Sequence, residues 1–316
     1  MCYSTIVLYL SESEVVELLP MSNCIDLMHK AFEQLALKDS VNQPRRRVVL
    51  PTGSVLHYMA AGTPKYFGAK IYSTHPRHGA HFLFLLYRSE DAKPLAIIEA
   101  NQLGQIRTGA ASGLATRLLA REDAAVVGII GSGFQAETQL AAMYAVRKIR
   151  SVRVWSRGAE KRKAFAAKLS VEAVETAQDA VEKADIVITA TNSKDPVFEA
   201  DWIAPGTHVN AMGSNQAGRR ELPPELLARA ENVVVDSIEQ SEMESGDLLL
   251  ARAEGKWKGE NLVELKDVVA GRVSGRSGKT AITIFKSNGV AVEDVAAAGW
   301  VYEQALERGL GRAVHS

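Results

Sequence analysis

The feature that most constrains the fold is residues 124–148, where an apolar run leads through a glycine-rich turn into a helical pattern. The run 125–130 is typical of a parallel strand covered on both faces. It ends in a G-x-G-x-x-A sequence, with which strand–turn–helix units bind a dinucleotide pyrophosphate. An ordinary turn between strand and helix can also carry this sequence, but the flanking strand and helix patterns favour the dinucleotide site. The residues of the turn are Gly131, Ser132, Gly133, Phe134, Gln135 and Ala136.

Each small residue of this turn has a physical purpose in the predicted site. Gly131 permits the tight turn, and Gly133 lets the backbone approach the phosphates. Ala136 lets the helix pack closely on the strand. The free N–H groups of the first helical turn then face the anion.

The sequence after this turn continues as alternating strand and helix patterns. Strands are predicted at 152–155, 173–174, 185–191, 208–213, 233–236 and 280–286. Helices are predicted between them at 159–169, 178–183 and 223–230, with one more amphipathic helix within 253–279. This alternation predicts a doubly wound Rossmann-type parallel sheet, whose ligands lie beyond the carboxyl ends of the strands. Thr191 and Asn215 occupy two such ends, although small polar residues are also common in loops without a role.

The N-terminal part predicts a smaller α+β domain. Helices are expected at 12–19, where Ser11 and Glu14 have the spacing of a capping box, and at 23–37. Strands are expected at 55–61, 67–74, 81–88 and 94–99 in an antiparallel or mixed sheet. The last helix, 290–308, returns to this domain. We therefore predict a substrate-binding and dimerisation domain at 1–120 with 298–316, and a dinucleotide-binding domain at 121–297.

Composition excludes several classes of partner. Lys+Arg and Asp+Glu both number 37, which argues against a nucleic-acid surface or a basic membrane-binding face. No apolar run has the ~20 residues of a membrane-spanning helix, and the run 6–10 is too short for a signal peptide. The cysteines, Cys2 and Cys24, suit a reducing cytoplasm. His75, His78 and His81 lie in a turn without an acid or cysteine beside them, so no metal is expected.

Four charged or titratable residues of the first domain are candidates for chemistry. Arg107 follows Leu103 in the apolar stripe of a helix at 102–120 and requires an anionic partner. An internal acid, a substrate carboxylate and a cofactor phosphate remain open. Arg46 lies in a run of three arginines, where a solvated strand edge is the ordinary interpretation. A solvated side chain is likewise ordinary for Lys70, and a core histidine for His57.

The end of the predicted second strand, 152–155, indicates which cofactor is preferred. NAD-binding domains carry an acid there that bonds the ribose 2′-hydroxyl. Here Ser156 and Arg157 follow the strand instead, with Lys161 and Arg162 one helical turn later. We therefore expect NADP(H) to be preferred, with NAD(H) possible.

Seven stretches resemble the ornithine cyclodeaminase/mu-crystallin family, in the family's order and over nearly the whole chain. They are QPRRRVV, GAKIYSTHP, QIRTGAASGLA, GSGFQA, ADIVITAT, NAMGSNQAGRREL and ITIFKSNGVAVEDVA. The resemblance implies two domains and a homodimer formed through the first domain. It also implies chemistry at the carbon between a carboxylate and an amine or imine.

Carried over residue by residue, the resemblance implies roles for the candidates. Arg46 and Arg107 would clamp the substrate carboxylate, and Lys70 would bond it or the reacting centre. The cofactor would be lined by Thr108, Gly131 to Ala136, Ser156, Arg157 and Ser287. Two residues depart from ornithine cyclodeaminases, because His57 stands where those enzymes have a glutamate and Asn215 where they have an aspartate.

Without these acids, cyclodeamination of a cationic diamino acid is disfavoured, whereas hydride transfer to a cyclic imine is not. We expect an NAD(P)H-dependent reductase that converts pyrroline-2-carboxylate or piperideine-2-carboxylate to proline or pipecolate. His57 or a water held by Lys70 would supply the proton. The alternatives are ornithine cyclodeaminase, alanine dehydrogenase and a mu-crystallin-like binding protein.

Overall fold

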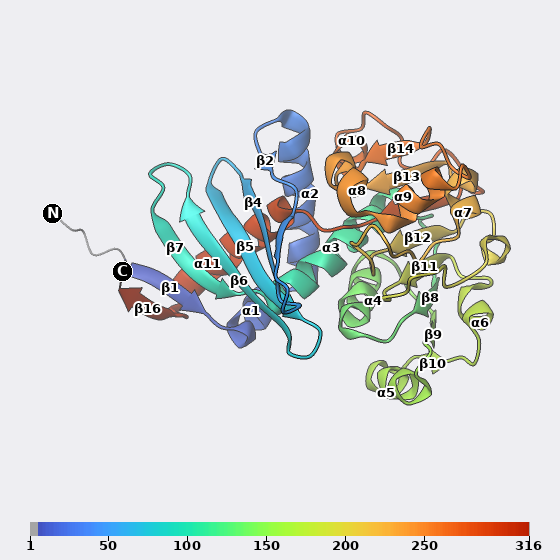
Figure 1. Cartoon of the computed structure of the whole chain (residues 1–316), viewed down its shortest axis with the longest axis horizontal. Coiled ribbons are helices and arrows are strands. Elements are labelled where there is room, and N and C mark those ends of the chain that lie inside the picture. The colour runs from blue at the N-terminus through green and yellow to red at the C-terminus, as the bar shows by residue number, and fades with distance from the viewer. Residues whose placement is uncertain (1–5, 316) are drawn as a thin grey trace. The chain divides into compact units, whose positions relative to one another are not determined.

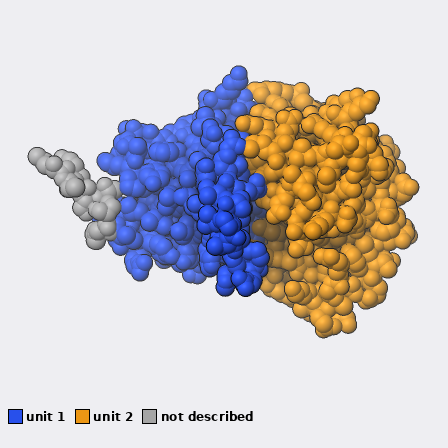
Figure 2. All heavy atoms as spheres, viewed as in Figure 1, with its two compact units in different colours: residues 1–108, 289–316 blue, residues 109–288 orange. Residues whose placement is uncertain are grey.

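The computed structural model describes residues 6–315, so Cys2 lies outside the described residues. The chain forms two compact units (Figure 2). Unit 1 comprises residues 1–108 and 289–316, and unit 2 comprises residues 109–288. The predicted boundaries at 120/121 and 297/298 differ from this division. The first observed boundary lies inside a helix rather than after it, and the second precedes the last helix rather than cutting it.

Unit 1 is built on a mixed eight-stranded sheet in the order β16-β1-β7-β6-β5-β4-β2, with β3 also paired to β4. The strands β1 and β7 are parallel, and the remaining pairs are antiparallel. This agrees with the expected antiparallel or mixed sheet. The strands are β1 (Ile6–Leu10), β2 (Val41–Asn42), β3 (Arg46–Val49), β4 (Val55–Gly62), β5 (Tyr66–His75), β6 (Gly79–Arg88), β7 (Pro94–Glu99) and β16 (Arg312–His315).

Helices cover one face of this sheet. Helix α11 (Ala291–Arg308) contacts β4, β5 and β6, and also packs against α2 (Met21–Leu37) (Figure 1). Helix α1 (Glu12–Leu18) begins with the predicted capping box, in which the Ser11 N–H and hydroxyl both donate to the Glu14 carboxylate. Helix α3 (Asn101–Leu119) begins in unit 1 and ends in unit 2.

Unit 2 contains an eight-stranded sheet in the order β10-β9-β8-β11-β12-β15-β13-β14, and every pair is parallel. The predicted doubly wound parallel sheet is therefore confirmed. The strands are β8 (Val126–Ile130), β9 (Ser151–Trp155), β10 (Glu172–Ala173), β11 (Ile186–Thr189), β12 (His208–Ala211), β13 (Asn232–Val235), β14 (Leu262–Glu264) and β15 (Thr283–Lys286).

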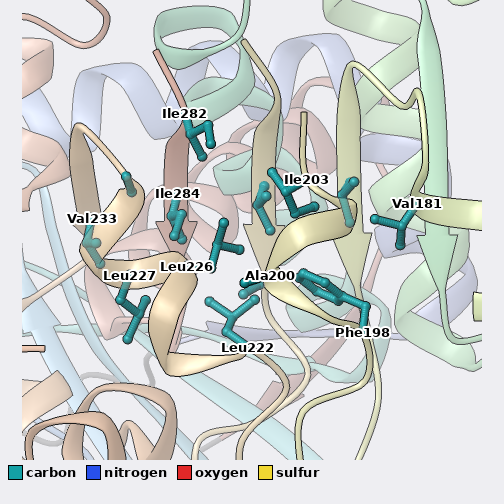
Figure 3. Packing of buried hydrophobic residues seen from close by; sticks show 14 of the residues in the cluster. Val181, Phe198, Ala200, Ile203, Leu222, Leu226, Leu227, Val233, Ile282 and Ile284 are labelled. Atoms are coloured by element: carbon teal, nitrogen blue, oxygen red, sulfur yellow. The ribbon is translucent and has the colours of Figure 1, made fainter. Parts of the chain in front are cut away.

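The helices and loops of unit 2 pack against the sheet and form a continuous apolar core with it. Ile284 of β15 and Val233 of β13 lie across from Leu226, Leu227 and neighbouring side chains (Figure 3). The helices are α4 (Phe134–Val146), α5 (Ala159–Leu169), α6 (Ala177–Val181), the 3₁₀ turn η1 (Ala200–Trp202), α7 (Pro224–Arg229), α8 (Ile238–Glu244), α9 (Gly246–Ala253) and α10 (Leu265–Val269). The predicted helix within 253–279 corresponds to α10, while α8 and α9 had no counterpart in the prediction.

Candidate functional site

Lys70 is buried on the helix-covered face of the unit-1 sheet, so its interpretation as a solvated side chain is wrong. It pairs in register with Met59 of β4 and Phe84 of β6. Helix α3 approaches closely here, because Gly104 has no side chain. A Cβ atom at position 104 would lie 2.5 Å from Lys70 Nζ. The Lys70 ammonium donates to Asp294 Oδ1 at 3.0 Å.

Arg107 of α3 is held by two carboxylates of α11. Its Nε donates to Asp294 Oδ1 at 3.0 Å, and its Nη1 donates to Glu293. Burial opposes the charge, but Asp294 and Glu293 outweigh it and raise the pKa of the guanidinium. The internal acid is therefore the realised partner for one side of the fork. Within residues 6–315, Nη2 of Arg107 has no hydrogen-bond partner, which leaves the other side of the fork for an external anion.

The arginine beside this cluster is Arg45 rather than Arg46. Arg45 is buried, and its Nη2 donates to the Gly289 carbonyl at 3.2 Å and lies 3.7 Å from Met59 Sδ. Arg46 is exposed at the start of β3, and the structure does not bury it with the cluster. In an extended chain successive side chains point to opposite faces. The structure therefore places Arg45, and not the predicted Arg46, in the buried cluster.

The buried charges of unit 1 do not cancel. Among its described residues, the buried charged side chains are Arg45, Lys70, Arg107, Glu293 and Asp294, three cations against two carboxylates. Burying charges of opposite sign together costs less than burying one sign alone, so a bound carboxylate is an anion that these cations can accept.

Lys70 is poised to give up a proton near neutral pH. Burial lowers the pKa of its ammonium to about 8, with Arg107 and Arg45 lowering it further and Asp294 opposing them. At pH 7 the group is therefore mostly protonated and still a good proton donor.

His57 has a different environment. Its ring stacks on Tyr72 at 4.3 Å, and Nε2 lies 2.9 Å from the Thr74 hydroxyl. Burial, followed by the charges of Arg47 and Arg45, lowers the pKa of His57 to about 4. The imidazole is neutral at pH 7 and is poorly suited to donate a proton.

The glycine-rich turn in unit 2 has the backbone geometry that a pyrophosphate requires. Gly131 has φ +116°, and a Cβ atom there would lie 2.4 Å from the Ala190 carbonyl oxygen. At Gly133 a Cβ atom would meet nothing within 4 Å. Helix α4 begins directly after it, and Gly133 provides no side-chain cap. The open approach and the helix N-terminus fit a dinucleotide phosphate. Ala136 is fully buried under the turn, as predicted for helix packing.

Two hydroxyl groups connect the glycine-rich turn after β8 to the loop that follows β9. Ser132 Oγ and Ser156 Oγ lie 2.8 Å apart. Arg162 is buried and donates to the Ser156 carbonyl at 3.1 Å, which fixes the backbone of this loop. Arg157 and Lys161 are exposed. In the α4 turn, Phe134 is exposed and Gln135 is half-buried.

A buried carboxylate that the sequence interpretation missed, Glu221, joins the loops after two neighbouring strands. Its Oε1 accepts the Thr191 N–H at 2.6 Å, and its Oε2 accepts the Gly213 N–H at 2.7 Å and the Thr189 hydroxyl at 2.9 Å. Its backbone N–H in turn donates to Asp247 Oδ1. The signal was the acid within NAMGSNQAGRREL, which the prediction used only for the resemblance.

The remaining predicted residues lie in local hydrogen-bonded positions. The Thr108 hydroxyl donates to the Gly104 carbonyl of its own helix at 2.6 Å. Ser287 Oγ lies 3.2 Å from Asp236 Oδ2, at the end of β15. Asn215 is half-buried in the loop after β12. The side chain of Thr191 adjoins the glycine turn, since its Cγ2 would lie 3.3 Å from a Cβ atom at Gly131.

Residues 6–315 contain neither a metal-site cluster nor a membrane-spanning helix. No group of three or more His, Cys, Asp or Glu side chains has the arrangement of a metal site. No helix is long and apolar enough to cross a membrane.

Comparison with known proteins agrees with the sequence and the fold. The model of the ornithine cyclodeaminase/mu-crystallin family matches residues 7–309. A Δ1-pyrroline-2-carboxylate reductase of Bacillus cereus is 34% identical over 97% of this chain and 99% of that protein. The solved structure of Thermococcus litoralis Δ1-pyrroline-2-carboxylate reductase in complex with NADH and L-proline has a TM-score of 0.93 and 35% identity, covering 98% of this chain and 100% of that one. An archaeal alanine dehydrogenase dimer with bound NAD has a TM-score of 0.93 and 33% identity, covering 98% and 99% of the two chains. The chain therefore belongs to the ornithine cyclodeaminase/mu-crystallin family.

Proposed function

We propose that the protein is an NAD(P)H-dependent reductase of cyclic 2-carboxy imines, converting pyrroline-2-carboxylate or piperideine-2-carboxylate to proline or pipecolate. The observation that carries the proposal is the buried cluster of unit 1, in which Lys70 and Arg107 share Asp294 while Arg107 Nη2 bonds neither Asp294 nor Glu293. A cyclic 2-carboxy imine carries one carboxylate for the arginines and one imine nitrogen for Lys70. The similarity to two pyrroline-2-carboxylate reductases over nearly the whole chain supports this choice.

In the proposed mechanism the arginines bind and Lys70 supplies the proton. Arg107 Nη2 and Arg45 bind the substrate carboxylate by charge-assisted hydrogen bonds and orient the ring. Lys70 Nζ gives one proton to the imine nitrogen and becomes neutral, which makes the adjacent carbon electrophilic. The hydride for that carbon would come from NAD(P)H, whose pyrophosphate the glycine-rich turn at Gly131 and Gly133 would hold. The C=N bond becomes C–N, and Lys70 regains its proton from solvent.

Lys70 replaces His57 as the favoured donor in this mechanism. With its pKa lowered to about 4, His57 is almost entirely neutral at pH 7, whereas Lys70 at about 8 remains protonated. His57 then serves as a neutral wall beside Tyr72. Of the two proton sources that the sequence left open, His57 and a water held by Lys70, the proposal keeps the Lys70 side and lets its ammonium donate directly.

A panel of substrates followed at 340 nm tests the proposed function. The panel contains both cyclic imines with NAD(P)H, pyruvate with ammonia and NAD(P)H, and ornithine with the oxidised cofactor, with proline assayed separately. We expect at least one cyclic imine to be reduced, with a kcat/KM higher than that of pyruvate or ornithine. Ornithine turnover without imine reduction would identify a cyclodeaminase, and pyruvate amination alone an alanine dehydrogenase. Cofactor binding without any turnover would identify a binding protein.

The proposal includes a preference for NADP(H) over NAD(H). The two solved relatives contain NADH and NAD, so this preference rests on the end of β9. No acid follows Trp155; Ser156 and the exposed Arg157 stand there instead. A charge-assisted contact of about 1.5–3 kcal/mol corresponds to roughly ten- to a hundredfold preference. The measurement is kcat/KM for NADPH and NADH on one imine. Ser156→Asp combined with Arg157→Ala should reverse the ratio, and equal values in the unmodified protein would refute the preference.

A homodimer formed through unit 1 is also part of the proposal. The uncovered face of its sheet exposes Val48, Leu56, Tyr58 and Leu83, on the neighbouring strands β3 to β6. Apolar side chains gathered on one face are typical of an interface, and a solved relative is a dimer. Light scattering after size-exclusion chromatography should give twice the mass of one chain. In Leu83→Lys the measured mass should fall to that of a single chain. The buried, free Cys24 agrees with a cytoplasmic location, which we also propose.

A further inference from the structure

One carboxylate oxygen in unit 1 accepts from two cations. Asp294 Oδ1 lies 3.0 Å from Lys70 Nζ and 3.0 Å from Arg107 Nε. All three side chains are buried. Two like charges this close repel strongly in a medium of low dielectric constant, and the shared carboxylate offsets that repulsion.

The three groups come from three different elements of unit 1. Lys70 lies on β5, Arg107 on α3 and Asp294 in the first turn of α11. A carboxylate in the first turn of a helix is further stabilised by the helix dipole. Asp294 is therefore a fixed point to which a strand and a second helix are both attached.

We propose that Asp294 is a positioning residue, which holds the Lys70 ammonium and the Arg107 guanidinium at a set separation through its single oxygen Oδ1. The inference rests on the proposed function, in which Arg107 binds the carboxylate and Lys70 protonates the imine nitrogen. In a cyclic 2-carboxy imine these two groups sit on the same carbon atom. The separation of the two cations must therefore match the span from the carboxylate to the nitrogen, and Asp294 sets it.

Glu293 is the matched comparison on the same helical turn. It contacts Arg107 Nη1, whereas the carboxylate that accepts from the Lys70 ammonium is Asp294. If Asp294 only balanced buried charge, the two acids would be equivalent. If it positions Lys70, their removal has different consequences.

The groups around Lys70 determine the sign of the effect. Arg107 and Arg45 are cationic and lower its pKa, and Asp294 raises it. Apart from Arg107 on α3 and Glu293 and Asp294 on α11, the neighbours named on the flanking elements are uncharged: Met59 on β4, Phe82 and Phe84 on β6 and Gly104 on α3. Removing the Asp294 charge therefore lowers the pKa of Lys70 below about 8, and the ammonium loses its proton at a lower pH.

The experiment compares Asp294→Asn with Glu293→Gln by two measurements. The first is the pH profile of kcat/KM and kcat for imine reduction. For Asp294→Asn we expect the alkaline limb to move down by at least about one pH unit and kcat at pH 8 to fall at least tenfold. For Glu293→Gln we expect a higher KM, with the alkaline limb in place. Equal shifts in both variants, or no shift in Asp294→Asn, would overturn the inference.

The second measurement does not depend on activity. Competitive acetylation of Lys70 at a series of pH values, read by mass spectrometry of the cofactor-free protein, reports its titration directly. A lower midpoint in Asp294→Asn than in Glu293→Gln supports the inference, and identical midpoints overturn it. A shifted midpoint in a protein that reduces no imine at all would refute the proposed function and leave the role of Asp294 supported.

Asp294→Glu keeps the charge but changes the reach of the carboxylate, and it answers the question if Asp294→Asn does not fold. We expect the alkaline limb to stay in place while kcat falls at least tenfold, because the charge is retained and the separation of the cations is not. Wild-type kcat in Asp294→Glu would show that the separation is immaterial and would overturn the inference.

Discussion

Arg45 and Arg46 are adjacent in the chain but lie in opposite surroundings. Arg45 is buried against Gly289 and Met59, whereas Arg46 is exposed at the start of β3. The strand period of two gives neighbours opposite faces, so a shift of one residue exchanges the buried and exposed members of a pair. Because both residues are arginines, the same substitution at each position tests which of them binds the substrate carboxylate.

Arg45→Lys should lower kcat/KM for the imine carboxylate about tenfold or more, while Arg46→Lys should change it less than twofold. Lysine keeps the charge but lacks the planar fork that binds a carboxylate, and a hydrogen bond between charged groups contributes about 1.5–3 kcal/mol. Steady-state kinetics of both variants with a saturating cofactor provide the comparison. A larger loss in Arg46→Lys would return the clamp to the position that the sequence had predicted.

At the scale of elements, α3 is fitted closely to the structure at two glycines of different kinds. A Cβ at Gly104 would lie 2.5 Å from Lys70 Nζ, the end of a flexible side chain. A Cβ at Gly109 would lie 2.5 Å from the backbone oxygen of Thr138, which cannot move independently of α4. The same substitution in one helix therefore has two different expected outcomes.

Gly104→Ala should leave the melting temperature unchanged or slightly raised, because alanine is favoured over glycine in a helix by up to about 1 kcal/mol. Its kcat should nevertheless fall at least tenfold, since the methyl group displaces Lys70 Nζ from Asp294. Gly109→Ala should instead lower the melting temperature by several degrees. Calorimetry and kinetics on both variants give the comparison, and unchanged kcat in a folded Gly104→Ala would contradict the role given to Lys70.

Glu221 connects the loops that follow β11 and β12. Glu221→Gln should weaken NAD(P)H binding about tenfold, because the amide nitrogen faces either the Thr191 N–H or the Gly213 N–H and one backbone donor loses its acceptor. Isothermal titration of the cofactor measures this loss. Glu225→Gln, at an exposed acid of α7, serves as the control and should bind the cofactor normally.

Local patterns predicted most elements of this fold, and long-range pairings accounted for the differences. The alternating strand and helix patterns identified the parallel sheet of unit 2, and the Ser11–Glu14 capping box marked the start of α1. In contrast, β16 forms only by pairing with β1 at the other end of the chain, which no local pattern indicates.

For the site, the sequence identified Arg107 because a charge in an apolar stripe requires a partner. It did not identify that Lys70 is buried, because that depends on Asp294, which lies far along the chain. The same holds for Glu221, whose three acceptor contacts come from loops that only the folded sheet brings together.

At the scale of the whole molecule, the buried neutral His208 makes the free energy of unfolding depend on pH. His208 is fully buried, with Nδ1 3.0 Å from the Thr283 hydroxyl and Nε2 3.2 Å from Asn210 Oδ1. Burial, and then the charge of Arg276, lowers its pKa to about 3. The unfolded chain binds this proton below about pH 6.5 and the folded chain does not. Stability from this group is therefore present above pH 6.5 and is lost as the pH falls toward 3.

Lowering the pH from 7.5 to 5 should cost unit 2 about 2 kcal/mol through His208 alone. In His208→Gln that part of the loss should disappear, although the variant is less stable at neutral pH. Urea unfolding of both proteins at the two pH values measures the difference. An equal loss in the two proteins would mean that His208 is protonated in the folded state as well.

The chain leaves unit 1 after Thr108 and returns at Gly289, where the side chain of Arg107 reaches the returning backbone. A Cβ on Gly289 would lie only 2.6 Å from Arg107 Nη1. Residues 109–288 are thus a loop whose ends must meet before unit 1 can form. With that loop unfolded, closing it costs about 4–5 kcal/mol of chain entropy. A folded unit 2 already holds its ends together and removes most of this cost. A nucleotide that stabilises unit 2 therefore also protects the carboxylate-binding cluster against unfolding, through the covalent connection of the chain alone.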